Sequence, residues 1–148
     1  YRVPGNTKPW AEFNFLADPE AAQQVFAAEW NDCLAVGLDV SQQVEITREV
    51  WERNRSAEQP GASVLSRVAA QTFLERPRYH FYLHDPLALA VGVDPTLVTR
   101  ERGSVTVDAG NETPGHTTFV PGEGSINIAS AVDAERFLRL FNGRIGIA

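Results

Sequence analysis

Apolar residues recur at the spacing of an amphipathic helix in several stretches of the chain. Asp18 and Pro19 form a helix start, and the apolar stripe behind them is Ala22, Val25, Phe26 and Trp30. A second helix is predicted around Val50 and Trp51. Two later stripes are Leu65, Val68, Ala69 and Phe73, ending before Pro77, and Ala134, Phe137, Leu138 and Phe141, ending before Gly143. Each stripe predicts a helix with one buried face.

Two apolar runs show no alternation with polar residues. Residues 34–40 form a short run, which is typical of a strand covered on both faces. Residues 87–91 follow Asp85-Pro86, where Asp85 would be the N-cap, and they are apolar on every side of the predicted helix. We therefore expect both the strand and the helix to be buried.

The remaining segments predict a loop and three short strands. Residues 1–10 contain two prolines and a glycine and predict the loop. The strands are expected at residues 104–107, 116–120 and 125–128. Together these elements predict an α/β protein with a small β-rich excursion before the last helix.

Composition and charge narrow the classes of function. The 148 residues suit one domain, and the net charge of −6 argues against nucleic-acid binding, which requires clustered Lys and Arg. No apolar run reaches the roughly 20 residues of a membrane span, so no membrane partner is expected. Cys33 is the only cysteine, which excludes an internal disulfide and a multi-cysteine zinc site and favours a reducing, cytoplasmic location.

The segment Glu12-Phe13-Asn14 is the first candidate site. In an extended segment, Glu12 and Asn14 would point to the same face, about 6.6 Å apart at roughly 3.3 Å per residue. A carboxylate and an amide at that spacing can hold neighbouring hydroxyls of a sugar, with Asn6 close by in the preceding loop. The alternative is a solvated loop in which both side chains face water.

The segment His84-Asp85-Pro86 is the second candidate site. A capping carboxylate at Asp85 would keep lone pairs for a cation or for sugar hydroxyls. His84 would present an imidazole beside it, and the ordinary pKa of that group suits proton transfer near neutral pH. The alternative is that Asp85 only caps the helix, because Asp-Pro also occurs at residues 18–19 and 94–95.

Four other residues are weaker candidates. His80 lies in the aromatic stretch of residues 79–83 and is expected to pack, whereas His116 is expected near a surface turn. Asp39 follows the apolar run, where α/β sheets place ligand contacts, although capping explains it equally well. Cys33 is expected to be a small apolar filler.

Two motifs resemble those of a known family. The string GNTKPWAEFNFLADPEAA, which contains Asn6 and ends at Ala22, resembles the sugar-binding segment of the inosine-uridine-preferring nucleoside hydrolases, GN-x-x-x-x-AEFN-x-x-x-DPEAA. The resemblance continues through residues 36–40, through HDPLALAVGVDPTLV at residues 84–98, and to residues 132–137. It covers essentially the whole chain in the family's order, and the AEFN and HDP motifs are specific in combination.

This resemblance implies a fold, an activity and a set of roles. The fold would be the C-terminal half of the family's Rossmann-like open sheet, and the activity would be hydrolysis of ribonucleosides to ribose and free base. The implied roles are ribose binding by Asn6, Glu12 and Asn14, a base-side contact from Phe13, protonation of the departing base by His84, and binding of a catalytic Ca²⁺ and a ribose hydroxyl by Asp85.

One signature of the family is absent from this sequence. The run D-x-D-x-x-x-DD supplies most of the family's metal carboxylates, and this chain has no Asp-Asp pair. Asp85 would then be the only carboxylate ligand carried over, which is too few for a Ca²⁺ ion with about 6–8 oxygen ligands.

We therefore expect residues 1–148 to be the C-terminal portion of a single nucleoside hydrolase domain. Its expected partners are a ribonucleoside, the metal-binding half and, as in many family members, further copies of itself. Base preference would depend on the metal-binding half and on residues 79–83. Two alternatives remain open: a half domain that binds a nucleoside or sugar without cleaving it, and an interaction module.

Overall fold

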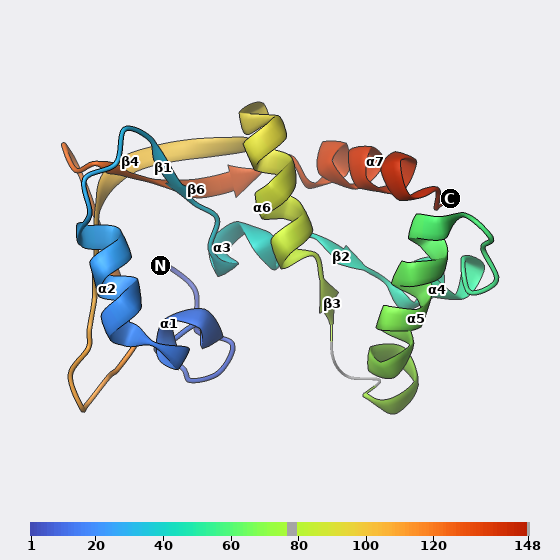
Figure 1. The fold of residues 1–148 in the computed structure, drawn as a ribbon, viewed down its shortest axis with the longest axis horizontal. Helices are drawn as coiled ribbons and strands as arrows, with labels where there is room; N and C mark the ends of the chain where they lie inside the picture. The colour runs from blue at the N-terminus through green and yellow to red at the C-terminus, as the bar shows by residue number, and fades with distance from the viewer. Residues whose placement is uncertain (77–79, 148) are drawn as a thin grey trace. The chain divides into compact units, whose positions relative to one another are not determined.

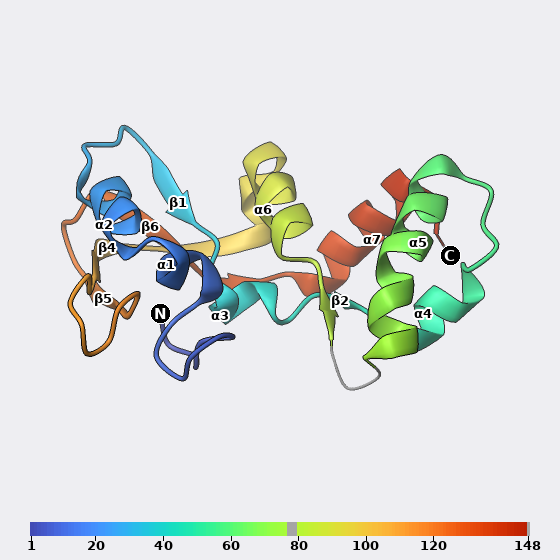
Figure 2. The ribbon, with the colours of Figure 1, turned by 60° about the horizontal axis from the view of Figure 1, so that its bottom comes forward.

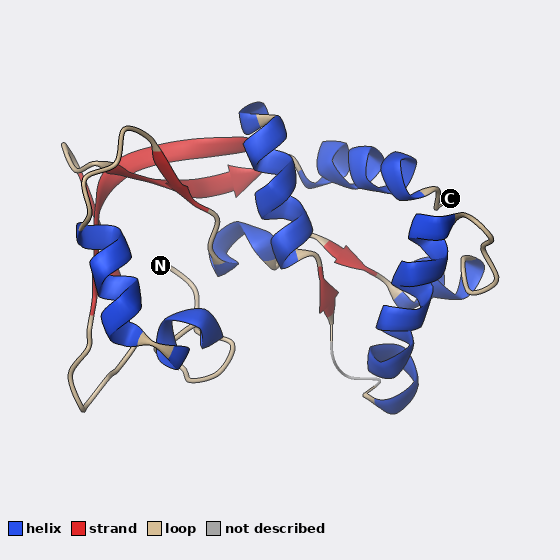
Figure 3. Cartoon of the chain, viewed as in Figure 1, coloured by secondary structure: helices blue, strands red, loops and turns tan. Residues whose placement is uncertain are grey.

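The computed structural model describes residues 1–76 and 80–147, so Tyr79 of the predicted aromatic stretch lies outside the described residues. The chain divides into two compact units, each built from two separate stretches. Unit 1 contains residues 1–40 and 98–131, and unit 2 contains residues 41–97 and 132–148. Both units mix helices with strands, which confirms the predicted α/β class (Figure 3). No helix in the described residues is long and apolar enough to cross a membrane.

Unit 1 is organised around an open four-stranded sheet. Its strands are β1 (Cys33–Ala35), β4 (Val98–Val107), β5 (Thr117–Pro121) and β6 (Ile126–Val132). Their order is β1-β6-β4-β5, with β1 parallel to β6 and β4 antiparallel to β5. Strands β1, β4 and β6 are labelled in Figure 1, and β5 is labelled in Figure 2. The three strands predicted from the β-rich excursion are confirmed, and β4 begins earlier than its alternating pattern predicted.

Two helices precede the sheet, α1 (Phe13–Ala17) and α2 (Pro19–Ala27). The predicted start of α2 is confirmed, because the Asp18 carboxylate accepts a hydrogen bond from the Ala21 backbone N–H at 2.9 Å. The helix ends at Ala27, and both Val25 and Trp30 are exposed, so the predicted stripe is buried only in part. Its Phe26 packs against the core formed by Val105, Ile126 and Ile128.

The strand predicted over residues 34–40 is confirmed only at its start, and the prediction that it is fully buried is wrong. β1 has only three residues, all half-buried, and it lies at the edge of the sheet. The chain then forms the short helix α3 (Leu38–Ser41), which buries Leu38 and Val40. An apolar run without alternation suits either arrangement, and tertiary packing selects the helical turn.

Unit 2 is mainly helical. It contains α4 (Arg48–Arg53), α5 (Pro60–Glu75), α6 (His84–Val93), the short 3₁₀ helix η1 (Pro95–Leu97) and α7 (Ala134–Ile145). The strands β2 (Glu45–Ile46) and β3 (Phe81–Tyr82) pair antiparallel beside them. Trp51 and Phe73 pack with ring centroids 5.2 Å apart, and the Trp51 indole donates to the Ser66 carbonyl at 2.9 Å.

The buried face of α5 differs from the predicted stripe. Its buried residues are Ala62, Ser66, Ala69 and Phe73, while Val68 is exposed. The small residues at this face allow close approach, and a Cβ added at Gly61 would lie 2.9 Å from the Ile145 Cα of α7. Ala69 and Phe73 of the predicted stripe are thus buried, and the buried face is shifted toward Ala62 and Ser66.

The other two helices of unit 2 also differ from prediction. α6 begins at His84 with Leu83 as N-cap, so Asp85 lies inside the first turn and is not the cap. Only one side of α6 is buried, through Leu87 and Val91, although the helix is apolar all round. α7 continues through the predicted end at Gly143 and ends at Gly146, whose φ of 77° only glycine adopts readily.

Candidate active-site residues

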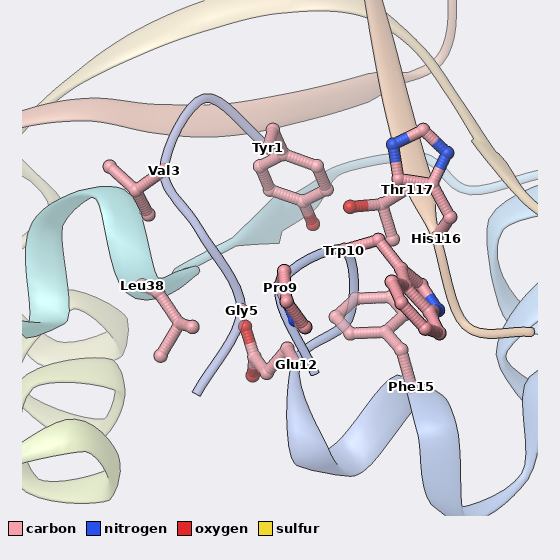
Figure 4. A pocket seen from close by; sticks show the side chains of 10 residues that line it. All are labelled: Tyr1, Val3, Gly5, Pro9, Trp10, Glu12, Phe15, Leu38, His116 and Thr117. Atoms are coloured by element: carbon pink, nitrogen blue, oxygen red, sulfur yellow. The ribbon is translucent and has the colours of Figure 1, made fainter. Parts of the chain in front are cut away.

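Unit 1 places Glu12 at the wall of a small cavity. Glu12 is the N-cap residue of α1, with an extended backbone, and its carboxylate projects into a cavity of about 80 Å³ (Figure 4). The cavity is lined by residues from the N-terminal loop, α1, α3 and the start of β5, which are Tyr1, Val3, Gly5, Pro9, Trp10, Glu12, Phe15, Leu38, His116 and Thr117. This volume holds a few water molecules or a group as small as a hydroxymethyl.

The surroundings of Glu12 disfavour its charge. Burial raises the pKa of the Glu12 carboxyl, and the nearby Asp39 carboxylate adds to the rise. The positive charge of the Tyr1 ammonium group and a hydrogen bond from the Leu38 backbone oppose this rise in pKa. A partly buried carboxylate is suited to accept hydrogen bonds from neutral hydroxyl groups.

Asn6 is brought to the same helix start. Its Oδ1 accepts a hydrogen bond from the Phe13 backbone N–H at 2.9 Å, which satisfies one of the free donors at the N-terminus of α1. Asn6 therefore braces the helix turn that carries Glu12, a contact that no local sequence pattern indicates.

The predicted pairing of Glu12 with Asn14 on one extended face is wrong. Asn14 lies inside α1, and helical residues two positions apart point to nearly opposite sides of the axis. Asn14 is exposed, and so is Phe13. Unit 1 thus brings Asn6 and Glu12 together and leaves Phe13 and Asn14 on the open surface of α1.

His116 and Trp10 were missed as neighbours of Glu12. His116 is exposed, as predicted, but it also lines the cavity and forms a bridge with Ala11. Gly115 makes this approach possible, because a Cβ there would lie 2.8 Å from the Leu16 backbone nitrogen. Nothing in the sequence signals a contact between segments so far apart, whereas Trp10 could have been suspected from its position beside the AEFN motif.

Unit 2 fixes the ring of His84. His84 is the first residue of α6, and its Nδ1 lies 2.7 Å from the Oγ of Ser41, a residue that is only 2% exposed. Burial lowers the pKa of the His84 imidazole, and the adjacent Asp85 carboxylate opposes this shift. If the Ser41 hydroxyl donates to Nδ1, the ring carries its proton on Nε2, where it is available to an external group. Ser41 was not predicted, because it is distant from His84 in sequence.

Asp85 lies at the rim of a much larger hollow. It is exposed in the first turn of α6 and lines a hollow of about 740 Å³ between α6 and α7. The other two Asp-Pro pairs are structural, since Asp18 caps α2 and Asp94 accepts from the Thr96 backbone N–H at 3.1 Å. Asp85 differs from Asp18 and Asp94 because it lies within the first turn of its helix and lines a hollow.

The weaker candidates have structural contacts. The His80 ring stacks on Tyr82 at 5.0 Å between centroids, and its Nδ1 lies 2.7 Å from Glu45. Asp39 accepts a hydrogen bond from the Arg2 backbone N–H at 2.9 Å. Cys33 packs against the core of unit 1, and burial raises the pKa of its thiol.

The donor set does not suffice for a metal ion. Within residues 1–76 and 80–147, no group of three or more His, Cys, Asp or Glu side chains could hold one. Ca²⁺ requires about 6–8 oxygen ligands, so the single carboxylate of Asp85 does not make a complete site.

The chain is similar to nucleoside hydrolases in sequence. The profile of the inosine-uridine preferring nucleoside hydrolase family matches residues 1–139. An inosine-uridine preferring nucleoside hydrolase of Leishmania major is 39% identical over 107 residues, which cover 70% of this chain and 34% of the relative. A pyrimidine-specific ribonucleoside hydrolase of Salmonella newport is 32% identical over 152 residues, which cover 95% of this chain and 49% of the relative.

Solved structures show the same likeness in fold. A purine-preferring ribonucleoside hydrolase of Gardnerella vaginalis is 32% identical with a TM-score of 0.80, covering 97% of this chain and 48% of that one. A plant nucleoside hydrolase is 30% identical with a TM-score of 0.84, covering 97% and 50%. The chain thus spans about a third to a half of the length of these relatives. Because the profile match runs through both motifs and nearly the whole sequence, the chain belongs to the inosine-uridine preferring nucleoside hydrolase family.

Proposed function

We propose that this chain supplies the ribose-binding and base-protonating side chains of a ribonucleoside hydrolase. The observation that carries the proposal is the family match over residues 1–139, which includes both the Glu12 cavity and the braced His84 ring. The names of the matched relatives give different substrate preferences: inosine and uridine, pyrimidine ribonucleosides, and purine ribonucleosides. The substrate class proposed is therefore a ribonucleoside, without a base preference.

The chemistry of N-glycosidic hydrolysis fits these side chains. The bond breaks through a transition state with positive charge on the sugar and negative charge on the leaving base. Glu12 would accept hydrogen bonds from ribose hydroxyls, with Asn6 and Asn14 as further contacts and Phe13 on the base side. His84 would donate the Nε2 proton to the departing base as negative charge develops there.

The proposal includes dependence on Ca²⁺, but this chain would supply only one of the ligands of the ion. Asp85 would be one carboxylate ligand of the ion and a contact for a ribose hydroxyl, and its place in the first turn of α6 leaves the carboxylate exposed. The remaining ligands must come from outside the described residues, in which no cluster of three such side chains occurs. A bound Ca²⁺ would supply charge stabilisation and an activated water.

The proposed partners follow from the same observation. The chain would form the C-terminal portion of the domain and act together with the half that supplies the other metal ligands, and homo-oligomers are expected as well. A cytoplasmic location stays a prediction that is based on the single Cys33. The second candidate function, binding of a nucleoside without cleavage, is favoured by the incomplete metal donor set.

A sugar-release assay separates these two functions. The chain is mixed with the complementary part of the Gardnerella vaginalis relative, and free ribose is measured with inosine and with uridine in the presence of Ca²⁺. Ribose released by the mixture, but not by a mixture containing His84→Ala, supports hydrolysis. Saturable nucleoside binding without ribose release by either mixture contradicts it and favours the binding function.

A further inference from the structure

Unit 2 exposes an apolar face along α6. Leu89 is 74% exposed and Val93 is 79% exposed, although Leu87 and Val91 on the other side of the helix are buried. Leu89 and Val93 line the hollow of about 740 Å³, whose opposite wall is formed by Phe137, Leu140 and Phe141 of α7. α6 is thus apolar on a side that none of the described residues of unit 2 covers.

This apolar face continues across α7 to α5. A second hollow of about 510 Å³ lies between α5 and α7, and it shares Phe141 and Ile145 with the first. Val64 and Val68 of α5 line it and are themselves exposed. Helix α7 lies between α6 and α5 (Figure 2), so the two hollows form one surface, which we call the α5–α7 face.

An exposed surface of this kind indicates an interaction site. Contiguous apolar patches larger than a few hundred Å² are rare on monomeric proteins, because exposed apolar surface is unfavourable in water. Isolated exposed apolar residues are common, whereas two adjoining hollows lined by apolar side chains from three helices mark a candidate interaction surface.

Two observations identify the occupant. The relatives are about twice as long as this chain in the structural comparisons, which cover 48% and 50% of their lengths, so a comparable length of the family domain lies outside this sequence. Asp85 lines the same hollow as Leu89. One carboxylate is not enough to form the proposed metal site, so further ligands would have to lie close to Asp85. Whatever covers this face therefore also comes close to Asp85.

We propose that the α5–α7 face is the docking surface for the half of the family domain that this chain does not match. That half would place apolar side chains against Leu89, Val93 and Phe141, and it would bring its own polar groups to Asp85 at the rim. The proposal deepens the proposed function by naming the surface its partner binds, and it rests on that function only for the role of Asp85.

The test compares two exposed leucines of unit 2. Leu89→Glu introduces a charge into the hollow, whereas Leu74→Glu places the same charge on α5 at a leucine that is 60% exposed and lines neither hollow. Neither side chain belongs to the core, so both variants should fold. The probe is the part of the Gardnerella vaginalis relative that does not align with this chain, produced separately. As a control, this probe must bind the other, aligned part of the same relative, which shows that it can form a complex.

Sedimentation velocity and titration give the outcome without any activity measurement. We expect a one-to-one complex whose Kd rises at least tenfold in Leu89→Glu and is unchanged in Leu74→Glu. The proposal is overturned if the competent probe does not bind this chain, or if the two variants bind equally well. It is also overturned if Leu89→Glu abolishes a homodimer instead, because a second copy would then be the occupant.

The same data separate this proposal from the proposed function. A complex that depends on Leu89 but releases no ribose would retain the docking surface and contradict hydrolysis. Ribose release that is insensitive to Leu89→Glu would retain hydrolysis and contradict the docking surface.

Discussion

His84 is the side chain on which the proposed chemistry depends most directly. A general acid matters only when the leaving group needs a proton. His84→Ala should therefore lower kcat for inosine by about 10²–10⁴-fold in the reconstituted complex, the range typical of general acids. A riboside with a nitrophenolate leaving group should be cleaved at nearly the wild-type rate. An equal loss on both substrates, measured by steady-state kinetics, would remove His84 as the acid.

Ser41 should act through His84 as a positioning residue. Its Oγ lies 2.7 Å from Nδ1 of His84, so Ser41→Ala frees the ring to rotate and to change tautomer. We expect kcat to fall by roughly 10- to 100-fold with little change in KM, as for other residues that orient a functional histidine. Ser41→Thr, which keeps the hydroxyl, should restore most of kcat. A loss that Thr does not restore would point to packing as the role of Ser41.

Glu12 should make stability depend on pH. Burial raises its pKa above the unfolded-state value of 4.5, so the folded state disfavours the charged form. The corresponding stability is fully present below the unfolded-state pKa and is lost as pH rises through the folded-state pKa. Glu12→Gln should thus increase the free energy of unfolding at pH 7, with a smaller difference at pH 4.

Urea denaturation at the two pH values checks this prediction. Glu123→Gln is the control, because Glu123 is an exposed residue of the same unit. A variant at Glu12 that is no more stable than the wild-type protein at pH 7 would contradict the burial argument. An increase there would mean that Glu12 is kept at the cavity for binding and not for stability.

The candidate site residues could be predicted only where the sequence signal is local. Glu12 and His84 stand in contiguous motifs, and the structure gives each a defined environment. Asn14 was placed on the wrong face because the AEFN segment continues into helix α1. Side chains two residues apart point to the same side of an extended strand but to nearly opposite sides of a helix. Ser41 and His116 were missed because their contacts join distant segments, and no local pattern encodes such contacts.

At the scale of elements, the Asp18 cap gives the sharpest prediction. The Asp18 carboxylate accepts the Ala21 backbone N–H, and α2 carries Phe26 against the core of unit 1. Asp18→Ala should lower the free energy of unfolding by about 0.5–2 kcal/mol, as for other N-caps. Guanidinium denaturation measures this, with Glu29→Ala, an exposed position just after the helix, as the control. Equal effects of the two substitutions would show that the cap contributes little.

The helix start at Asp18-Pro19 and the three later strands were predictable, whereas the Asp85 cap and the burial of several elements were not. Asp18-Pro19 acts locally, and the last five residues of β4 alternate between buried and exposed. The apolar run at residues 34–40 and helix α6 looked buried on all sides, yet the first is an edge strand followed by a helical turn and the second is covered on one side only. Sheet order and the number of covering layers depend on the assembled fold, not on the segment.

At the scale of the whole molecule, family membership was predictable and the two compact units were not. The motifs keep the family's order along the chain, whereas each unit joins two stretches that are separated in sequence. Glu12 belongs to unit 1 and His84 to unit 2, and the proposed function requires the side chains of both residues.

One kinetic comparison tests this requirement most directly. In the complex with the complementary half, kcat/KM for inosine is measured for Glu12→Ala and for His84→Ala, beside Val25→Ala and Leu74→Glu as exposed controls in units 1 and 2. We predict a loss of at least about 100-fold for each site variant, the scale of a lost transition-state contact, and no change for the controls. Wild-type hydrolysis of inosine after replacement of either Glu12 or His84 would contradict the requirement for both side chains.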